Sequence, residues 1–160
     1  MSQKGRDPKV THKIMSAIPS KNTEPELMLR KALWKENLRY RVNYKKLPGK
    51  PDIAFTKYHV AVFCDGDYWH GHNWAIRGLG SLEDELADYT EFWRSKILRN
   101  IERDEEVNQE LKSQGWVVIR LWESDIRSNL AGCVETIKDA LSGRRADQSA
   151  DWSCRTIKTQ

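Results

Sequence analysis

The chain has 160 residues and a formal net charge of +4, from 27 lysines and arginines against 23 aspartates and glutamates. This length predicts one domain with a sizeable core. Three cysteines without a Cys-x-x-Cys pair argue against a disulfide framework and against a cysteine-rich zinc site. We find no secretory signal and no apolar stretch that could span a bilayer, so we expect a cytoplasmic protein.

The charges are unevenly distributed along the chain. Basic residues are frequent in the first fifty positions, whereas acidic residues gather around Asp65 and between Glu83 and Asp88. An acidic pocket within a basic surround suits a metal-dependent enzyme that acts on a polyanion. Ordinary solvated surface charge is the alternative explanation.

Hydrophobic periodicity and turn residues predict the elements in chain order. They are a short helix over 10–17, a helix over 23–37, a strand over 38–44, two strands over 53–55 and 59–64 joined as a hairpin, a mobile loop over 78–88, a long helix over 89–114, a buried strand over 116–121 and an amphipathic helix over 129–141. Thr23 and Glu26 have the spacing of a capping box. The order αβββαβα predicts an α/β fold with a mixed sheet flanked by helices.

The segment from Phe63 to His72 carries most of the candidate chemistry. Its sequence, FCDGDYWHGH, ends an apolar run in two carboxylates, two aromatic residues and two histidines. Upstream, a Pro-Gly-Lys-Pro turn delivers Asp52 to the start of the neighbouring strand. In an antiparallel hairpin Cys64 and Asp65 lie near Asp52, so the Asp52 carboxylate and the Cys64 carbonyl can share one cation.

This hairpin, with an acid on its first strand, resembles the PD-(D/E)xK nuclease core. The pattern is imperfect because Asp67 stands where a lysine is expected. Ordinary turn chemistry is the alternative explanation for Asp52, since aspartate is common in turns.

Two further residues are candidates for acid–base work. His70 lies a few residues beyond the expected metal ligands, and an imidazole with a pKa of about 6.5 can accept a proton from water at neutral pH. A histidine satisfied by a carbonyl is the alternative. Asp104 shares the apolar face of the long helix with Ile97, Ile101 and Leu111, so it needs a partner. An imidazolium or a neighbouring arginine would serve.

Glu26 and the aromatic pair Tyr68 and Trp69 each have two interpretations. Glu26 shares a helix face with Leu29 and Leu33, which points it toward the core side, yet a capping-box glutamate needs no other role. Tyr68 and Trp69 could wedge between DNA bases, or one of the rings could pack into the core.

Together these residues resemble the very short patch repair (Vsr) mismatch endonucleases and their EDxHD nuclease relatives. The matching blocks are Lys13-x-Met15-x-Ala17-Ile18, Leu47-Pro48-Gly49-x-Pro51-Asp52, Phe63 with Gly66 and Trp69-His70, Phe92-Trp93-x-x-Lys96-Ile97-x-x-Asn100-x-x-Arg103-Asp104, and Gly115-Trp116-x-Val118 with Trp122-Glu123. The resemblance implies a restriction-endonuclease-like core that nicks double-stranded DNA with Mg²⁺.

The resemblance also implies roles for single residues. Asp52 and the Cys64 carbonyl would bind the metal, His70 would activate water, Asp104 would orient His70, and Glu26 would hold metal-bound water. The rings of Tyr68 and Trp69 would intercalate beside a mismatch. We expect Lys13 and Lys50 to contact the DNA backbone.

The chain departs from the family pattern in three places, one of which is a longer loop over 75–88. Asp65 stands where those enzymes carry a second catalytic histidine, and it could add a metal ligand or alter the protonation scheme. The repair enzymes hold a structural zinc through cysteines and a histidine, and the matching residues here are Asp67, His72, Trp74 and Ser124. The local acids suit harder cations, so we expect no structural zinc.

We therefore predict a monomeric, Mg²⁺-dependent DNA endonuclease, either a mismatch-directed nickase in DNA repair or a nuclease for restriction or defence. A DNA-binding module that has lost cleavage is the alternative from another class. The expected organisation is a basic N-terminal arm over 1–22, a nuclease domain over 23–142 and a polar tail over 143–160.

Overall fold

The computed structural model describes residues 21–149, with side chains up to residue 145. Within this range the elements are α2 (Glu24–Lys35), β1 (Arg41–Val42), β2 (Ile53–Phe55), β3 (Val60–Asp65), α3 (Asn73–Ile76), α4 (Leu82–Leu86), α5 (Glu91–Ser113), β4 (Val117–Trp122), α6 (Glu123–Ser128) and α7 (Leu130–Ser149). No helix among the described residues combines the length and apolar character needed to cross a membrane.

One mixed sheet organises the domain, with the strand order β1-β2-β3-β4. The expected hairpin is confirmed, since β2 and β3 pair antiparallel with Ile53 opposite Val62. After the long helix α5 the chain returns as β4, which runs parallel to β3 and pairs Phe63 with Arg120. The central strands β2 and β3 are buried throughout, which explains their continuous apolar sequence.

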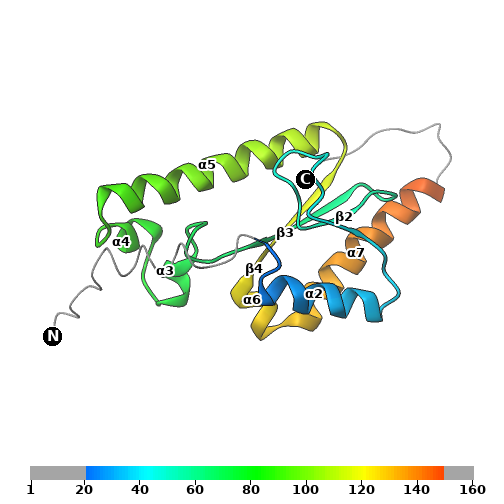
Figure 1. The fold of residues 1–160 in the computed structure, drawn as a ribbon, viewed down its shortest axis with the longest axis horizontal. Coiled ribbons are helices and arrows are strands. Elements are labelled where there is room, and N and C mark those ends of the chain that lie inside the picture. Colours follow the sequence, from blue (N-terminus) through cyan, green and yellow to red (C-terminus); the bar gives the residue numbers. More distant parts are fainter. Residues whose placement is uncertain (1–20, 150–160) are drawn as a thin grey trace.

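Helices cover both faces of the sheet (Figure 1), and the side chains of β3 alternate between them. Val60, Val62 and Cys64 pack in the larger core with residues of α2, α6 and α7. Ala61 and Phe63 pack instead against Leu111 of α5. By the same alternation Asp65 lies on the α5 side, where the strand ends.

Several elements differ from the prediction. The strand expected over 38–44 is only Arg41–Val42, and Asn43, which follows it, has a φ of 46°. The loop expected over 78–88 contains α4, which begins where the Ser81 hydroxyl accepts a hydrogen bond from the Asp84 N–H at 3.2 Å. The last helix continues to Ser149, past the boundary expected at 142. The helix expected over 10–17 lies outside the described residues.

The start of α2 is also built differently from the predicted capping box. Thr23 is the N-cap residue, but its side chain makes no capping hydrogen bond. The Glu26 carboxylate accepts hydrogen bonds from the Asn22 N–H at 2.8 Å and from Arg30 at 3.2 Å. Glu26 is therefore buried and held, while the Thr23 hydroxyl reaches Glu123 at 3.5 Å.

Candidate active site

A cleft of about 1110 Å³ opens where β3 ends and the chain turns toward α3. Its wall is built by α2, the start of β2, the end of β3, the segment that follows β3, and α5. All of the candidate site residues within 21–149 line it, namely Glu26, Lys50, Asp52, Cys64, Asp65, Tyr68, Trp69, His70 and Asp104. Lys13 lies outside the described residues. Residues far apart in sequence thus meet in one cleft.

Asp52 sits on the acidic side of this cleft. Its Oδ2 atom accepts a hydrogen bond from the Cys64 N–H at 2.7 Å, as the hairpin geometry predicts. Burial raises the pKa of Asp52 to about 7, and the nearby carboxylates of Glu26 and Asp65 add to the rise. The negative charges of these neighbouring carboxylates repel one another. A cation bound among them would therefore be stabilising.

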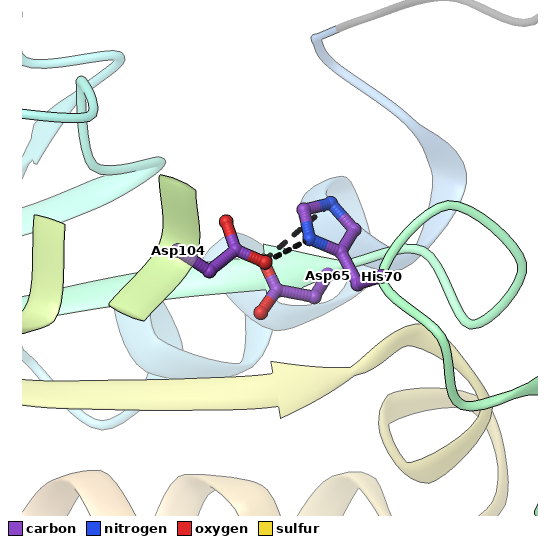
Figure 2. Close-up of side chains that lie close together, drawn as sticks. All are labelled: Asp65, His70 and Asp104. Carbon is purple, nitrogen blue, oxygen red and sulfur yellow. Dashed lines mark hydrogen bonds and ion pairs between the residues drawn. The ribbon is translucent and has the colours of Figure 1, made fainter. Parts of the chain in front are cut away.

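His70 lies between two carboxylates (Figure 2). Its Nδ1 atom forms a short hydrogen bond with Asp104, and its Nε2 atom lies 3.9 Å from Asp65 Oδ1. Burial lowers the pKa of His70, but the hydrogen bond that its ring donates to Asp104 and the charges of both acids outweigh it, so the pKa lies above its usual value. The Asp104 carboxylate therefore orients the ring and stabilises its protonated form.

Arg120 completes this group, although no pattern in the sequence had singled it out. Its Nη1 atom donates to both carboxylate oxygens of Asp65 at 3.0 Å and lies 3.4 Å from Asp104 Oδ1. Its Nε atom donates to Asn108 at 2.7 Å, and its guanidinium lies 4.2 Å from the centre of the Phe63 ring. Both partners considered for Asp104, an imidazole and an arginine, are therefore present.

We expect Arg120→Met to lower both stability and activity, because it leaves Asp65 and Asp104 without their shared cation. Removing one partner of a buried ion pair costs about 3–5 kcal/mol. Arg120→Lys keeps the charge but loses the forked geometry, so its loss of stability should be smaller. Urea denaturation measures the difference. Equal stability of Arg120→Met and the wild type would contradict this role.

The segment after β3 is tied to the start of α6 by Asp67. The Asp67 carboxylate accepts hydrogen bonds from the Ser124 N–H at 3.0 Å and the Ser124 hydroxyl at 2.7 Å, and it contacts His72 Nδ1 at 2.8 Å. The His72 ring stacks on Trp122 at 4.2 Å. Three of the four residues at the family's zinc positions thus contribute to a hydrogen-bonded network. The part of the chain described here shows no cluster of metal-binding side chains at this place.

We expect Ser124→Ala to reduce the rate of the reaction in this cleft more than it reduces the affinity for the substrate. It removes one of the hydrogen bonds that hold the His70-bearing segment against α6, a loss of about 1 kcal/mol. The matched control is Ser142→Ala on the exposed side of α7. Steady-state kinetics distinguish the two effects, and a change in KM alone would contradict a positioning role for this network.

Tyr68 and Trp69 both belong to an aromatic group at the edge of the cleft. The Trp69 ring lies 5.5 Å from the Trp93 ring, and the ammonium of Lys96 lies 4.8 Å from its centre. Tyr68 packs against Tyr89 at 5.7 Å. Both rings are half-buried, so neither of the two is simply a core residue.

Glu123 is a further acid of the cleft, to which the sequence patterns gave no role. Burial raises its pKa, and the charge of Asp67 adds to the rise. It stands in the Trp122-Glu123 block, so its place in the motif was the available signal. For Arg120 the signal was an arginine inside the apolar run of β4, a strand that was expected to be buried but in which only Ile119 and Leu121 are.

Two places could be considered for a divalent metal. Ligand atoms of Asp65, His70 and Asp104 lie within 4.8 Å of one another. The positive charge of Arg120, already bound to Asp65, opposes a dication there. Among residues 21–145 no lysine or arginine forms an ion pair with Asp52, and a metal there would offset the cost of a buried negative charge, which raises the pKa of Asp52. The second place fits a hard cation better.

Comparison with known proteins assigns the chain to a family. Residues 5–76 match the family described as DNA mismatch endonuclease Vsr. The type II nicking enzyme V.NmeDIP of Neisseria meningitidis serogroup C is 44% identical over 138 residues, which are 86% of this chain and 90% of that protein. The type II nicking enzyme V.HpaIIP of Haemophilus parainfluenzae is 44% identical over 110 residues, covering 69% and 74% of the two chains.

The DNA mismatch endonuclease Vsr of Escherichia coli K12 is 32% identical over 142 residues, covering 89% of this chain and 82% of that protein. The chain therefore belongs to the Vsr family of DNA endonucleases.

Proposed function

We propose that the protein nicks one strand of double-stranded DNA beside a mismatch, by Mg²⁺-dependent hydrolysis of a phosphodiester bond. The observation that carries this proposal is the meeting of Asp52, His70 and Asp104 in one cleft. The antiparallel hairpin with Asp52 at its start, next to the parallel strand β4, supports a restriction-endonuclease-like core of the PD-(D/E)xK type. The protein would act as a monomer, with residues 23–142 as its nuclease domain.

The Asp52 carboxylate and the Cys64 carbonyl would hold the metal. Their fit rests on the buried acidic surroundings of Asp52, which disfavour its charge when no cation is near. When bound, Mg²⁺ would polarise a phosphoryl oxygen and offset the charge that develops there.

The side chains of the protein supply proton transfer and positioning. His70 accepts the proton of the attacking water, while Asp104 keeps the ring oriented and stabilises the imidazolium that forms. Glu26, which accepts a hydrogen bond from Arg30, would hold that water through its carboxylate. Lys21, Lys45 and Lys50 line the same cleft and would hold the DNA backbone.

The aromatic group supports recognition of a distorted base step. Tyr68 and Trp69 stand at the edge of the cleft, where an apolar ring could enter a weakened stack beside a mismatch. Their packing against Tyr89 and Trp93 would hold the rings in place for that purpose. The second candidate is a restriction or defence nuclease, which the names of the nicking enzymes among its relatives favour.

A plasmid assay tests this function. Supercoiled plasmids carrying one T·G pair, or the matched T·A pair, are incubated with Mg²⁺, Mn²⁺ or EDTA. We expect a relaxed circle from the T·G plasmid with either metal and intact plasmid with EDTA. Equal cutting of both plasmids would favour the restriction nuclease. Binding without any product would show a DNA-binding module that has lost cleavage.

A further inference from the structure

A second pocket, of about 510 Å³, lies at the opposite end of the β2–β3 hairpin from Asp52. It is formed by the segment that leads into β1, the hairpin turn and the C-terminal part of α7. Four of its lining residues are basic, namely Arg39, Arg41, Lys57 and Arg145, and none is acidic. This composition contrasts with the active-site cleft, where acids and bases are mixed.

Two of the three arginines of this pocket lie over aromatic rings. The Arg39 guanidinium lies 3.5 Å from the centre of the Trp34 ring, and that of Arg145 lies 5.2 Å from the centre of the Tyr58 ring. No carboxylate within residues 21–145 forms an ion pair with Arg39, Arg41 or Arg145. A guanidinium stacked on a ring is oriented but keeps N–H donors for an anion.

Two surface cations outside the pocket are paired with carboxylates. Arg127 pairs with Glu24 at 3.0 Å, and Lys138 pairs with Glu36 at 3.1 Å. In the pocket the hydrogen bond from Arg145, together with the charges of Arg145 and Lys57, lowers the pKa of the Tyr58 hydroxyl. The lowered pKa of this phenol indicates a positive electrostatic potential around Tyr58. Such a potential attracts anions to the pocket.

The chain connects this pocket directly to the active site. Arg41 pairs with Ala54, and the Asn43 N–H donates to the Asp52 carbonyl oxygen at 3.0 Å. Arg39 and Arg41 line the second pocket. Further along the same segment, Asn43 and the basic residues Lys45 and Lys50 line the active-site cleft. One basic segment therefore runs from one site to the other.

The distance between Asp52 and the second pocket can be expressed as a number of nucleotides along a DNA strand. From Asp52 to Thr56, where the hairpin turn begins, there are four residues, or roughly 13 Å at about 3.3 Å per residue of strand. A DNA strand advances by about 3.4 Å per nucleotide, so this length corresponds to about four nucleotides.

We propose that the pocket of Arg39, Arg41, Lys57 and Arg145 is a second DNA site, which binds backbone phosphates about four nucleotides from the scissile phosphate. The inference rests on the proposed function, in that DNA is the polyanion that both sites bind. The pocket positions the duplex by its charge and reads no base, so it adds affinity without altering the chemical step.

Binding to duplexes of different lengths tests the proposal. The double variant Arg41→Gln/Arg145→Gln removes two cations of the pocket, and Arg127→Gln/Lys138→Gln is the control with the same change in charge. Fluorescence anisotropy in EDTA measures binding without cleavage. One duplex has about 24 base pairs with a T·G pair at its centre. Two shorter duplexes keep only about three base pairs on one side of the T·G pair, the left side in one and the right side in the other.

On the long duplex we expect the pocket variant to bind about tenfold more weakly than the wild type, with a salt slope lower by about one to two. On one of the shortened duplexes the wild type and the variant should bind equally, because the phosphates that reach the pocket are gone. The control variant should behave as the wild type on every duplex, and the rate at saturating DNA should not change in either variant.

Wild-type affinity of the pocket variant on the long duplex would overturn the proposal. An equal loss of affinity on all three duplexes would also overturn it, since this would show a general effect of charge. An equal loss of affinity in the control variant would do the same. These measurements need no cleavage. A protein that binds DNA but does not nick it would therefore contradict the proposed function. The same titrations would still test whether the second site binds DNA.

Discussion

Asp52→Asn is expected to abolish nicking and, at the same time, to stabilise the metal-free protein at pH 8. Asparagine is a neutral and weaker ligand for Mg²⁺, so the rate should fall by about 1000-fold or more. Its side-chain oxygen can still accept the hydrogen bond from the Cys64 N–H, so the hairpin keeps its local structure.

The gain in stability follows from the direction of the pKa shift. The folded-state pKa of Asp52 is about 7 and the ordinary value is 3.8, so the folded protein holds a proton that the unfolded chain has lost. Stability is therefore lost as the pH rises from about 4 through about 7, by an amount on the order of 2–4 kcal/mol. The amide of the Asp52→Asn variant carries no charge and avoids this loss.

Thermal unfolding at pH 8 measures the effect. In EDTA the variant should melt several degrees above the wild type. Added Mg²⁺ should raise the Tm of the wild type, because a ligand that binds only the folded state stabilises it, and it should leave the variant unchanged. An active variant, or a variant with the same response to Mg²⁺ as the wild type, would remove Asp52 from the metal site.

His70→Ala is expected to lower the nicking rate by about 10²–10⁴-fold, the range typical of a general base. The effect should fall on kcat, because DNA affinity depends on the cations of the cleft and not on this ring. His59→Ala, an exposed histidine at the far end of β3, is the matched control and should retain the wild-type rate.

Imidazole added to the buffer provides a second measurement for the same variant. It should restore part of the rate of His70→Ala, because a small base can enter the space that the side chain leaves, and it should not affect the control. Circular dichroism checks that both variants are folded. A folded His70→Ala protein with near wild-type activity would contradict the proposed site.

The parts of the fold that follow from local patterns were predictable. Alternating and continuous apolar runs indicated the hairpin, and the face of α5 was visible from Ile97, Asp104 and Leu111. The hairpin then accounted for the contact between Asp52 and Cys64. The length of the strand over 38–44 was overestimated. The alternation of polar and apolar residues does not show that Asn43 turns the chain away after two paired residues.

The contacts that hold the site were harder to predict. Arg120 reaches Asp65 only because β4 lies beside β3 in one particular parallel register, which depends on the whole of α5. Asp67 and Ser124 are 57 residues apart, and neither has a pattern that names the other. Such partners are set by tertiary packing, which periodicity and spacing do not describe.

The ion pair between Asp65 and Arg120 has a consequence for how the sheet assembles. A slip of β4 by one residue against β3 would turn Arg120 to the opposite face, among the aliphatic side chains of α2 and α7. An uncompensated guanidinium in that layer would be strongly unfavourable. The charges that hold His70 in place thus also favour the correct alignment of the two strands over a shifted one while the protein folds.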